Sequence, residues 1–169
     1  MRECINVAFW GNNAYVKKFI NKYGAAHINK KNESGATVLM FTAMQGDKDA
    51  LAFLLEKGAD IEAKDRWNMT ALMHAASHGH KDNVMLLLKN GADTEKKCKD
   101  GRTALMFAEE DRFFKIAKLL KQWPERQRKL KERQLARELD EITKTVMGGL
   151  TKALPYKPLF KFLPPGGSS

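Results

Sequence analysis

The chain has 169 residues, of which 43% are hydrophobic, and its 30 basic and 20 acidic side chains give a net charge of +10 at pH 7. This length and apolar content suffice for one packed domain with an appendage. The sequence contains no run of 18 apolar residues and no signal-peptide core, which excludes a membrane-spanning helix and favours a cytoplasmic or nuclear protein.

One motif recurs at a fixed interval along the chain. Thr37, Thr70 and Thr103 are evenly spaced. The same interval separates the leucines two positions later and two pairs of glycines, which are Leu39, Leu72 and Leu105, Gly46 and Gly79, and Gly58 and Gly91. A fixed period of about 20–50 residues predicts a solenoid of stacked repeats.

The best-preserved copy spans residues 65–97. It reads T-A-L-M-H-A-A from Thr70, then G-H, V-M-L-L-L and G-A-D. This copy resembles the ankyrin repeat, a unit of about 33 residues with T-P-L-H-x-A-A, G-H, V-V-x-L-L-L and G-A-D segments, and the resemblance covers about residues 1–123. It implies an all-α solenoid of helix-turn-helix units with extended finger loops. The family's proline is replaced by Val38, Ala71 and Ala104 and its histidine by Met40, Met73 and Met106, so that histidine's hydrogen bonds are expected to be absent.

The predicted repeat domain spans residues 1–124, with a degenerate repeat at 1–31 and further repeats at about 32–64, 65–97 and 98–124. In the degenerate repeat, two short helices are expected on the apolar residues Ile5, Ala8 and Phe9 and then Val16, Phe19 and Ile20, before a Gly24-Ala25-Ala26 connection. The next repeat should have helices near 38–45 and 48–57, ended by Gly58. Stacking should bury Leu39, Ala43, Leu54 and Leu55 against Leu72, Ala76, Leu87 and Leu88.

The connecting segments 60–69 and 93–102 are predicted to be extended fingers. In the family, fingertips and the concave face of the first helices contact the partner, so the resemblance implies a set of partner-binding residues: Phe41, Met44, Gln45, Lys64, Arg66, Trp67, His74, Ser77, His78, Lys97, Lys99, Arg102 and Phe107. Trp67 is the most informative, because an aromatic beside an arginine is typical of hot spots; the alternative is that it lies flat on its own repeat. Phe41, His74 and Phe107 share one repeat position, which predicts an exposed stripe on the concave face.

Two features superficially suit metal binding or catalysis. Three histidines fall between residues 74 and 80, but no carboxylate or cysteine is placed to complete a metal site and the HExxH glutamate is absent. The carboxylates at 109–111 have the pattern of a solvated surface. Cys4 and Cys98 lie far apart, so neither a disulfide framework nor a zinc site is expected. Without a nucleophile elbow or phosphate loop, the sequence predicts a protein that is not an enzyme and uses no cofactor or metal.

The repeat at 98–124 should close the solenoid. Pro124 is expected to end its second helix, with Trp123 packed over the last repeat. Residues 125–149 are then predicted to form a charged helix, ended by Gly148 and Gly149, followed at 150–169 by a proline-containing flexible tail with a docking segment. The helix carries a narrow apolar seam, near a heptad pattern but short for a coiled coil: Leu130, Leu135, Leu139, Ile142 and Val146. Its partner is the solenoid's own end, a second copy of the chain, another protein's helix, or none that is fixed.

The charge and the motifs together predict a function. Residues 1–123 hold 20 basic and 15 acidic side chains and residues 124–169 hold 10 and 5, so the excess of +5 in each part is denser in the tail. Interleaved carboxylates and the lack of aromatics on the helix favour an acidic protein over nucleic acid or a membrane surface. We therefore expect a non-enzymatic protein-protein interaction module or scaffold that binds through fingertips and concave face. The alternative is a regulatory inhibitor of an enzyme or transcription factor, as in small ankyrin inhibitors, and nucleic-acid or acidic-membrane binding is less favoured.

Overall fold

The computed structural model describes residues 13–23 and 27–153, and within them every regular element is a helix. The chain divides into two compact units, Met1–Pro124 and Glu125–Ser169, which are described separately. Three of the expectations above lie outside the described residues: the first helix of the degenerate repeat, the connection at 24–26 and the docking segment of the tail.

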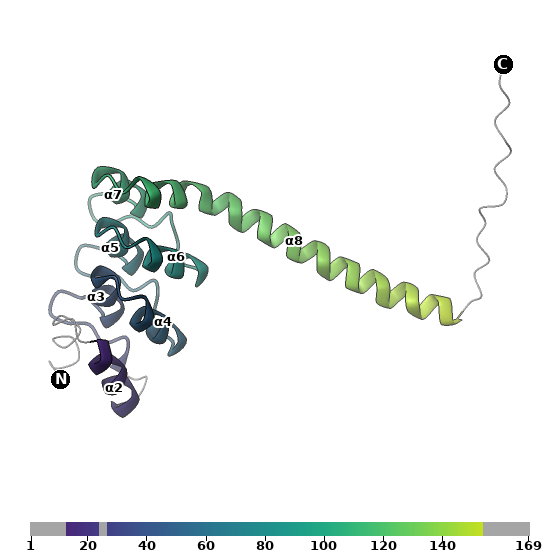
Figure 1. Ribbon diagram of the computed structural model, residues 1–169, viewed down its shortest axis with the longest axis horizontal. Coiled ribbons are helices and arrows are strands. Elements are labelled where there is room, and N and C mark those ends of the chain that lie inside the picture. Colours follow the sequence, from purple (N-terminus) through teal and green to yellow (C-terminus); the bar gives the residue numbers. More distant parts are fainter. Residues whose placement is uncertain (1–12, 24–26, 154–169) are drawn as a thin grey trace, which may run out of the picture. The chain divides into compact units, whose positions relative to one another are not determined.

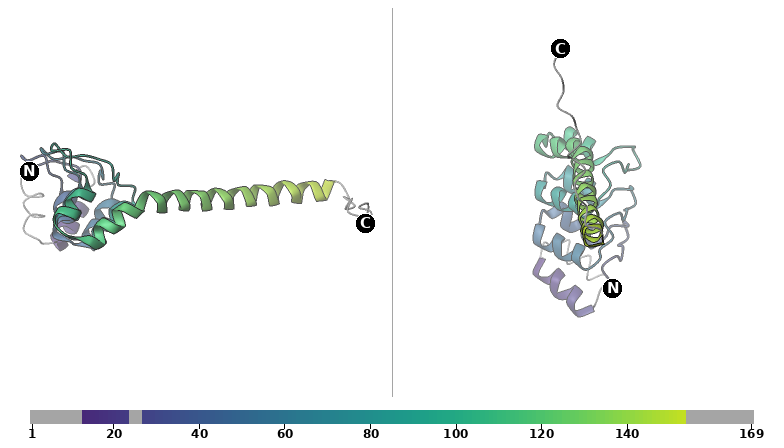
Figure 2. Two further views of the ribbon diagram at one scale, coloured as in Figure 1. Left: turned by 90° about the horizontal axis from the view of Figure 1, so that it is seen from above. Right: turned by 90° about the vertical axis from the view of Figure 1, so that its right-hand side faces the viewer.

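The helices of the first unit are stacked in two layers. After α2 (Asn13–Tyr23) come the pairs α3 (Val38–Gln45) with α4 (Lys48–Glu56), α5 (Ala71–Ser77) with α6 (Lys81–Lys89), and α7 (Ala104–Glu110) with the start of α8 (Phe114–Ala153). Helix α3 packs on α5 and α5 on α7, while α2, α4 and α6 pack on one another in the second layer (Figure 1). Figure 2 shows the same stack from two further sides, with the helices in the order of the chain.

Each first helix begins at a threonine of the repeat. The hydroxyls of Thr37, Thr70 and Thr103 accept hydrogen bonds from the backbone N–H three residues later, at 3.5, 3.5 and 3.4 Å. Such a side chain satisfies a donor that the helix leaves unpaired. In the first of these helices the N–H of Thr37 also donates to the sulfur of Met40 at 3.5 Å. A methionine here thus retains part of the bonding that was expected to be lost with the family's histidine.

The core consists of the repeated leucines and alanines. The expected stacking residues are buried, apart from half-buried Leu55. At about 1.5–3 kcal/mol for each fully buried aliphatic side chain, these layers are the main source of stability. The repeats are also joined by Asn83, whose buried amide donates to the carbonyl oxygens of Thr42 and Ala43 at 3.2 and 3.3 Å. Trp123 is buried with the core at the end of the last repeat, as expected.

Two expected helix ends are wrong. Helix α8 continues through Pro124 and through Gly148 and Gly149 to Ala153. A proline inside a helix removes one donor, here the one that would reach the carbonyl of Leu120, and clashes locally. Strong helix formers on its C-terminal side, mainly Arg, Lys, Gln, Leu and Glu, offset that loss and carry the helix onward.

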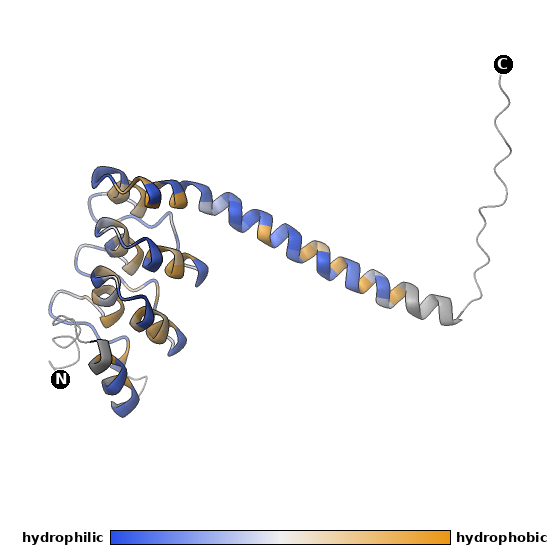
Figure 3. Cartoon of the chain, viewed as in Figure 1, coloured by the Kyte–Doolittle hydropathy of each residue, from blue (hydrophilic) through white to orange (hydrophobic). Residues whose placement is uncertain are grey.

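The part of α8 in the second unit is exposed along its length. Residues 125–146 are all exposed except half-buried Gln127. The helix is largely hydrophilic, with separate hydrophobic positions along it (Figure 3), and each of the five seam residues is more than half exposed. Ion pairs such as Arg128 with Glu125 at 2.8 Å line the same helix, and pairs exposed to solvent in this way add little to stability. In the part of the chain that the structure describes, no helix combines the length and the apolar character that a membrane span requires.

Candidate functional site

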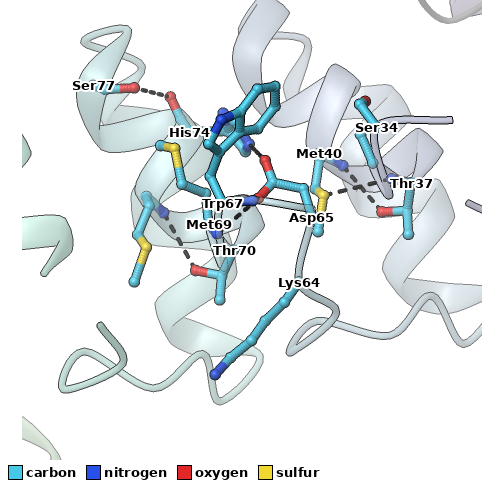
Figure 4. Close-up of polar contacts among 12 residues, drawn as sticks. Ser34, Thr37, Met40, Lys64, Asp65, Trp67, Met69, Thr70, His74 and Ser77 are labelled. Carbon is cyan, nitrogen blue, oxygen red and sulfur yellow. Dashed lines mark hydrogen bonds and ion pairs between the residues drawn. The ribbon is translucent and has the colours of Figure 1, made fainter. Parts of the chain in front are cut away.

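A buried carboxylate fixes the base of the finger at residues 60–69. Asp65, only 5% exposed, accepts hydrogen bonds at Oδ1 from the N–H groups of Trp67 and Met69, both at 2.9 Å. Its Oδ2 lies 3.0 Å from Nε2 of His74 on α5 (Figure 4). The same residue therefore closes the turn of the finger and ties that finger to the helix that follows it.

His74 helps to hold the base of the finger, and its side chain is not exposed for contact with a partner. Its side chain is buried, with 8% of the residue exposed. Burial lowers the pKa of His74, the hydrogen bond and charge of Asp65 oppose this, and the charge of His78 lowers the pKa further. The imidazole is therefore neutral near pH 7 and donates Nε2–H to the carboxylate. The expectation that His74 lies on an exposed stripe is wrong, because the carboxylate at the base of the finger holds the ring inside the protein.

Successive fingers are joined by backbone hydrogen bonds. The N–H of Arg66 donates to the carbonyl of Ser34, and the N–H of Lys99 donates to the carbonyl of Trp67, both at 2.9 Å. These two bonds join equivalent positions of successive repeats, so they recur with the solenoid. Each finger is thereby held to its neighbour by the main chain, which leaves the side chains at the tip free to differ.

The tip of the central finger presents a tryptophan to solvent. Trp67 is 50% exposed, and the guanidinium carbon of Arg66 lies 4.8 Å from the centre of its ring. A cation over an aromatic ring at this distance is attracted by the ring's negative face. Lys97 and Lys99 are exposed on the next finger, whereas Lys64 is half-buried. We call the four exposed residues Arg66, Trp67, Lys97 and Lys99 the fingertip surface.

The exposed phenylalanine stripe expected on the concave face does not form. Phe107 is 7% exposed and Phe41 is half-buried. The guanidinium of Arg102 covers the ring of Phe107 at 4.4 Å and donates to Glu110 at 2.9 Å and Asp100 at 3.1 Å. The hydrogen bond to Glu110, followed by the one to Asp100, raises the pKa of Arg102. Half-buried Arg102 therefore covers the ring of Phe107.

The remaining predicted residues lie at the C-terminal ends of α3 and α5. The hydroxyl of Ser77 donates to the carbonyl of His74 at 3.1 Å and lies 3.0 Å from Nδ1 of His78. The rings of His78 and His80 are stacked, with their centroids 6.5 Å apart, and Nε2 of His80 donates to the carbonyl of Met44 at 2.8 Å. Of this group His78 is exposed, while Met44, Gln45 and Ser77 are half-buried. Among the described residues no three metal-binding side chains are grouped to hold an ion.

The family model for ankyrin repeats, in three copies, matches residues 4–98 and 60–129, well over half of the chain. The chain belongs to the ankyrin repeat family. Ankyrin repeats are in general protein-protein interaction modules, and domains built from them are typically non-enzymatic. A search of curated proteins gives no match.

The sequence-based site of this ankyrin protein divides by exposure. The four residues of the fingertip surface and His78 are exposed, Phe41, Met44, Gln45, Lys64, Ser77 and Arg102 are half-buried, and His74 and Phe107 are buried. The sequence reasoning missed Asp65. The sequence carries a signal for it, because Asn32 holds the same position in the preceding repeat. The structure shows the same role there, since Oδ1 of Asn32 accepts hydrogen bonds from the N–H groups of Ser34 and Ala36, both at 2.9 Å.

Proposed function

We propose that this chain binds a protein partner through its fingertip surface. The observation that carries the proposal is Trp67, a half-exposed tryptophan with Arg66 against its ring. Tryptophan and arginine are enriched among the residues that dominate binding energy. The buried Asp65 fixes the finger beneath them, and a preorganised site loses less conformational entropy on binding.

The charge of the fingertip surface indicates the kind of partner. Arg66, Lys97 and Lys99 are cationic and exposed, and among the described residues none of them lies within ion-pairing distance of a carboxylate. Complementary charge steers association and selects against like-charged surfaces. We therefore propose an acidic protein surface with a pocket for the indole ring.

A second protein-binding surface is proposed on α8. Its five seam residues are each more than half exposed. Four of them, Leu135, Leu139, Ile142 and Val146, follow one another at intervals of four, three and four residues, which places them on one side of the helix. An apolar line of this kind is buried in a short coiled coil by pairing with a second helix. A second copy of the chain or another protein's helix would supply it, and the chain would then act as a scaffold that joins two partners.

We place this function in the cytoplasm or nucleus. Cys98 is a free, buried thiol, and the sequence holds a single further cysteine, Cys4. A chain that relied on disulfides in an oxidising compartment would carry a denser cysteine framework. Staining of the tagged full chain in cells checks this placement.

The fingertip surface is tested by quantitative affinity capture. The tagged full chain, Trp67→Ala and the control Lys89→Ala, an exposed lysine of α6, are each incubated with a cell extract, and the retained proteins are quantified by mass spectrometry. We expect retention of a specific protein to fall at least about tenfold for Trp67→Ala alone, since hot-spot truncations cost about 2 kcal/mol or more. Equal retention by wild type and Trp67→Ala for every captured protein would refute the proposal.

A further inference from the structure

A hollow of about 350 Å³ lies at the turns between paired helices, where α5 leads to α6 and α7 leads to α8. Its apolar lining includes Gly79, Phe113 and Phe114, and its cationic lining is Lys81, Arg112 and Lys115. None of these residues belongs to the fingertip surface. The hollow is therefore a separate feature of the solenoid, formed by its last two repeats.

Arg112 occupies a position that the repeat assigns to glycine. Gly46 and Gly79 hold this position in the two preceding repeats and have φ values of +83° and +78°. Arg112 has the same left-handed conformation, with φ +59°. A side chain at positive φ strains the backbone, and such strain concentrates at functional sites. The stack does not need an arginine here, since glycine serves in the two earlier turns.

Phe114 departs from the repeat in the same place. The corresponding residues of the two preceding repeats are Lys48 and Lys81, both exposed lysines at the start of a helix. Phe114 is 72% exposed to water. Next to it, the ring of Phe113 packs on Gly79, where an added Cβ would lie only 2.5 Å from a ring carbon. The hollow thus combines a fixed aromatic ring with a second ring that lacks cover.

Three of the residues that line the hollow are cationic. Among the described residues, Lys81, Arg112 and Lys115 make no ion pair with a carboxylate. The carboxylates nearest to them in sequence, Asp82 and Asp111, do not line the hollow. Three unpaired positive charges around an apolar surface favour a ligand that combines negative charge with an apolar group.

We propose that the hollow at Arg112 and Phe114 binds an acidic peptide segment of another protein, with one apolar side chain against Phe114 and carboxylates facing Lys81, Arg112 and Lys115. Binding removes the exposed ring from water and pairs the three cations. A single-stranded nucleic acid instead needs a charged groove that follows several nucleotides, and this hollow has room for only one or two side chains.

The test is a titration of the ¹⁵N-labelled full chain, followed by NMR, with the peptide Ac-Glu-Glu-Leu-Phe-Glu-Glu-NH₂. We expect saturable shifts at the amides of residues 79–81 and 112–116. The Kd should rise about tenfold in Arg112→Gly and in Phe114→Ser, which corresponds to one or two lost contacts. Lys118→Gln, an exposed lysine of α8 outside the hollow, should bind as the wild type does, and so should Trp67→Ala. A peptide with lysines in place of the glutamates should not bind.

Arg112→Gly also separates binding from folding. Glycine accepts the positive φ without strain, so the Tm of this variant should rise while its affinity falls. Unchanged affinity in both Arg112→Gly and Phe114→Ser would overturn the proposal. It would also be overturned by shifts that map to the fingertip surface and not to residues 79–81 and 112–116, or by tighter binding of oligothymidylate that the same two variants abolish.

Discussion

At the scale of the residue, Asp65 shows how a buried side chain can fix the conformation of the fingertip surface above it. Its carboxylate is buried and accepts three hydrogen bonds, two from the finger and one from His74. Hydrogen bonds to an ionised group contribute about 1.5–3 kcal/mol each, more than those between neutral groups. The conformation of the fingertip surface therefore depends on a residue that no partner would touch.

The pair of His74 and Asp65 also makes stability depend on pH. Burial lowers the pKa of His74 below 6.5, the value for an unperturbed histidine, and Asp65 opposes this without reversing it. As the pH falls, the unfolded chain therefore binds a proton at this residue before the folded chain does. The stabilisation is fully present above about pH 6.5 and is lost as the pH falls through the lowered folded pKa.

The prediction is checked with His74→Gln, which keeps an amide donor near Asp65 but does not titrate. We expect the free energy of unfolding in urea to decrease less between about pH 7 and about pH 5 in this variant than in the wild type. Lys89→Gln, a change at an exposed lysine of α6, should retain the decrease seen in the wild type. Equal decreases in His74→Gln and the wild type would show that His74 titrates alike in the folded and unfolded chain.

The exposed part of the candidate site could be predicted from sequence, and the buried part could not. Trp67 and Arg66 were predictable because a finger tip has no core to enter. His74 and Phe107 were misplaced because repeat position specifies only a side of the helix. Their burial depends on a residue from another segment that contacts each of them, which is Asp65 for His74 and Arg102 for Phe107. That pairing is a contact between elements, and local periodicity carries no information about it.

At the scale of the element, the turns that end helices in the repeats depend on their glycines for two different reasons. Gly79 and Gly91 both have positive φ, +78° and +91°. A Cβ on Gly79 would lie 2.5 Å from the ring of Phe113, whereas nothing lies within 4 Å of one on Gly91. Gly91 thus meets the need for a left-handed conformation alone, and Gly79 also meets the need for a position without a side chain.

Alanine substitutions separate these two requirements. Gly91→Ala should lower the free energy of unfolding by about 1 kcal/mol, the cost of a left-handed residue with a Cβ. Gly79→Ala should lower it by about 3 kcal/mol, because the overlap with Phe113 adds a packing cost. Urea unfolding followed by circular dichroism measures both. Similar losses for the two variants would mean that the Phe113 ring moves aside without cost.

Helix limits were predictable where the repeat specifies them and not beyond it. The helices at Val38–Gln45 and Lys48–Glu56 agree with the predicted ranges to within one residue, since threonine caps and left-handed glycines recur at fixed positions. The continuation of α8 through Pro124 was not predictable from that residue. A proline destabilises a helix locally. Whether the helix still continues through it depends on the helix-forming residues on both sides.

At the scale of the whole molecule, stability is concentrated in the repeats. Every described residue that is buried lies at or before Trp123. The repeats are coupled by shared leucine layers and by bonds such as those from Asn83 to the carbonyls at the end of α3. In a solenoid of this kind, stability is close to a sum of repeat and interface contributions. Since none of residues 125–146 is buried, we expect this helix to contribute to neither sum.

A chain that ends after Lys129 tests whether stability is concentrated in the repeats. It retains all the described residues that are buried and a short helical stretch beyond Trp123. Its Tm should therefore stay within about 2 °C of the full chain, and its urea m-value, which scales with the surface exposed on unfolding, should be nearly unchanged. Tryptophan fluorescence, to which the buried Trp123 contributes, follows both. The same truncation removes the α8 seam, so any self-association of the full chain, measured by sedimentation, should disappear. Leu139→Lys in the full chain is the matched variant, because it should abolish that association and leave the Tm unchanged. A drop in Tm of more than about 5 °C on truncation would instead show that the second unit contributes about 1 kcal/mol or more to the repeats.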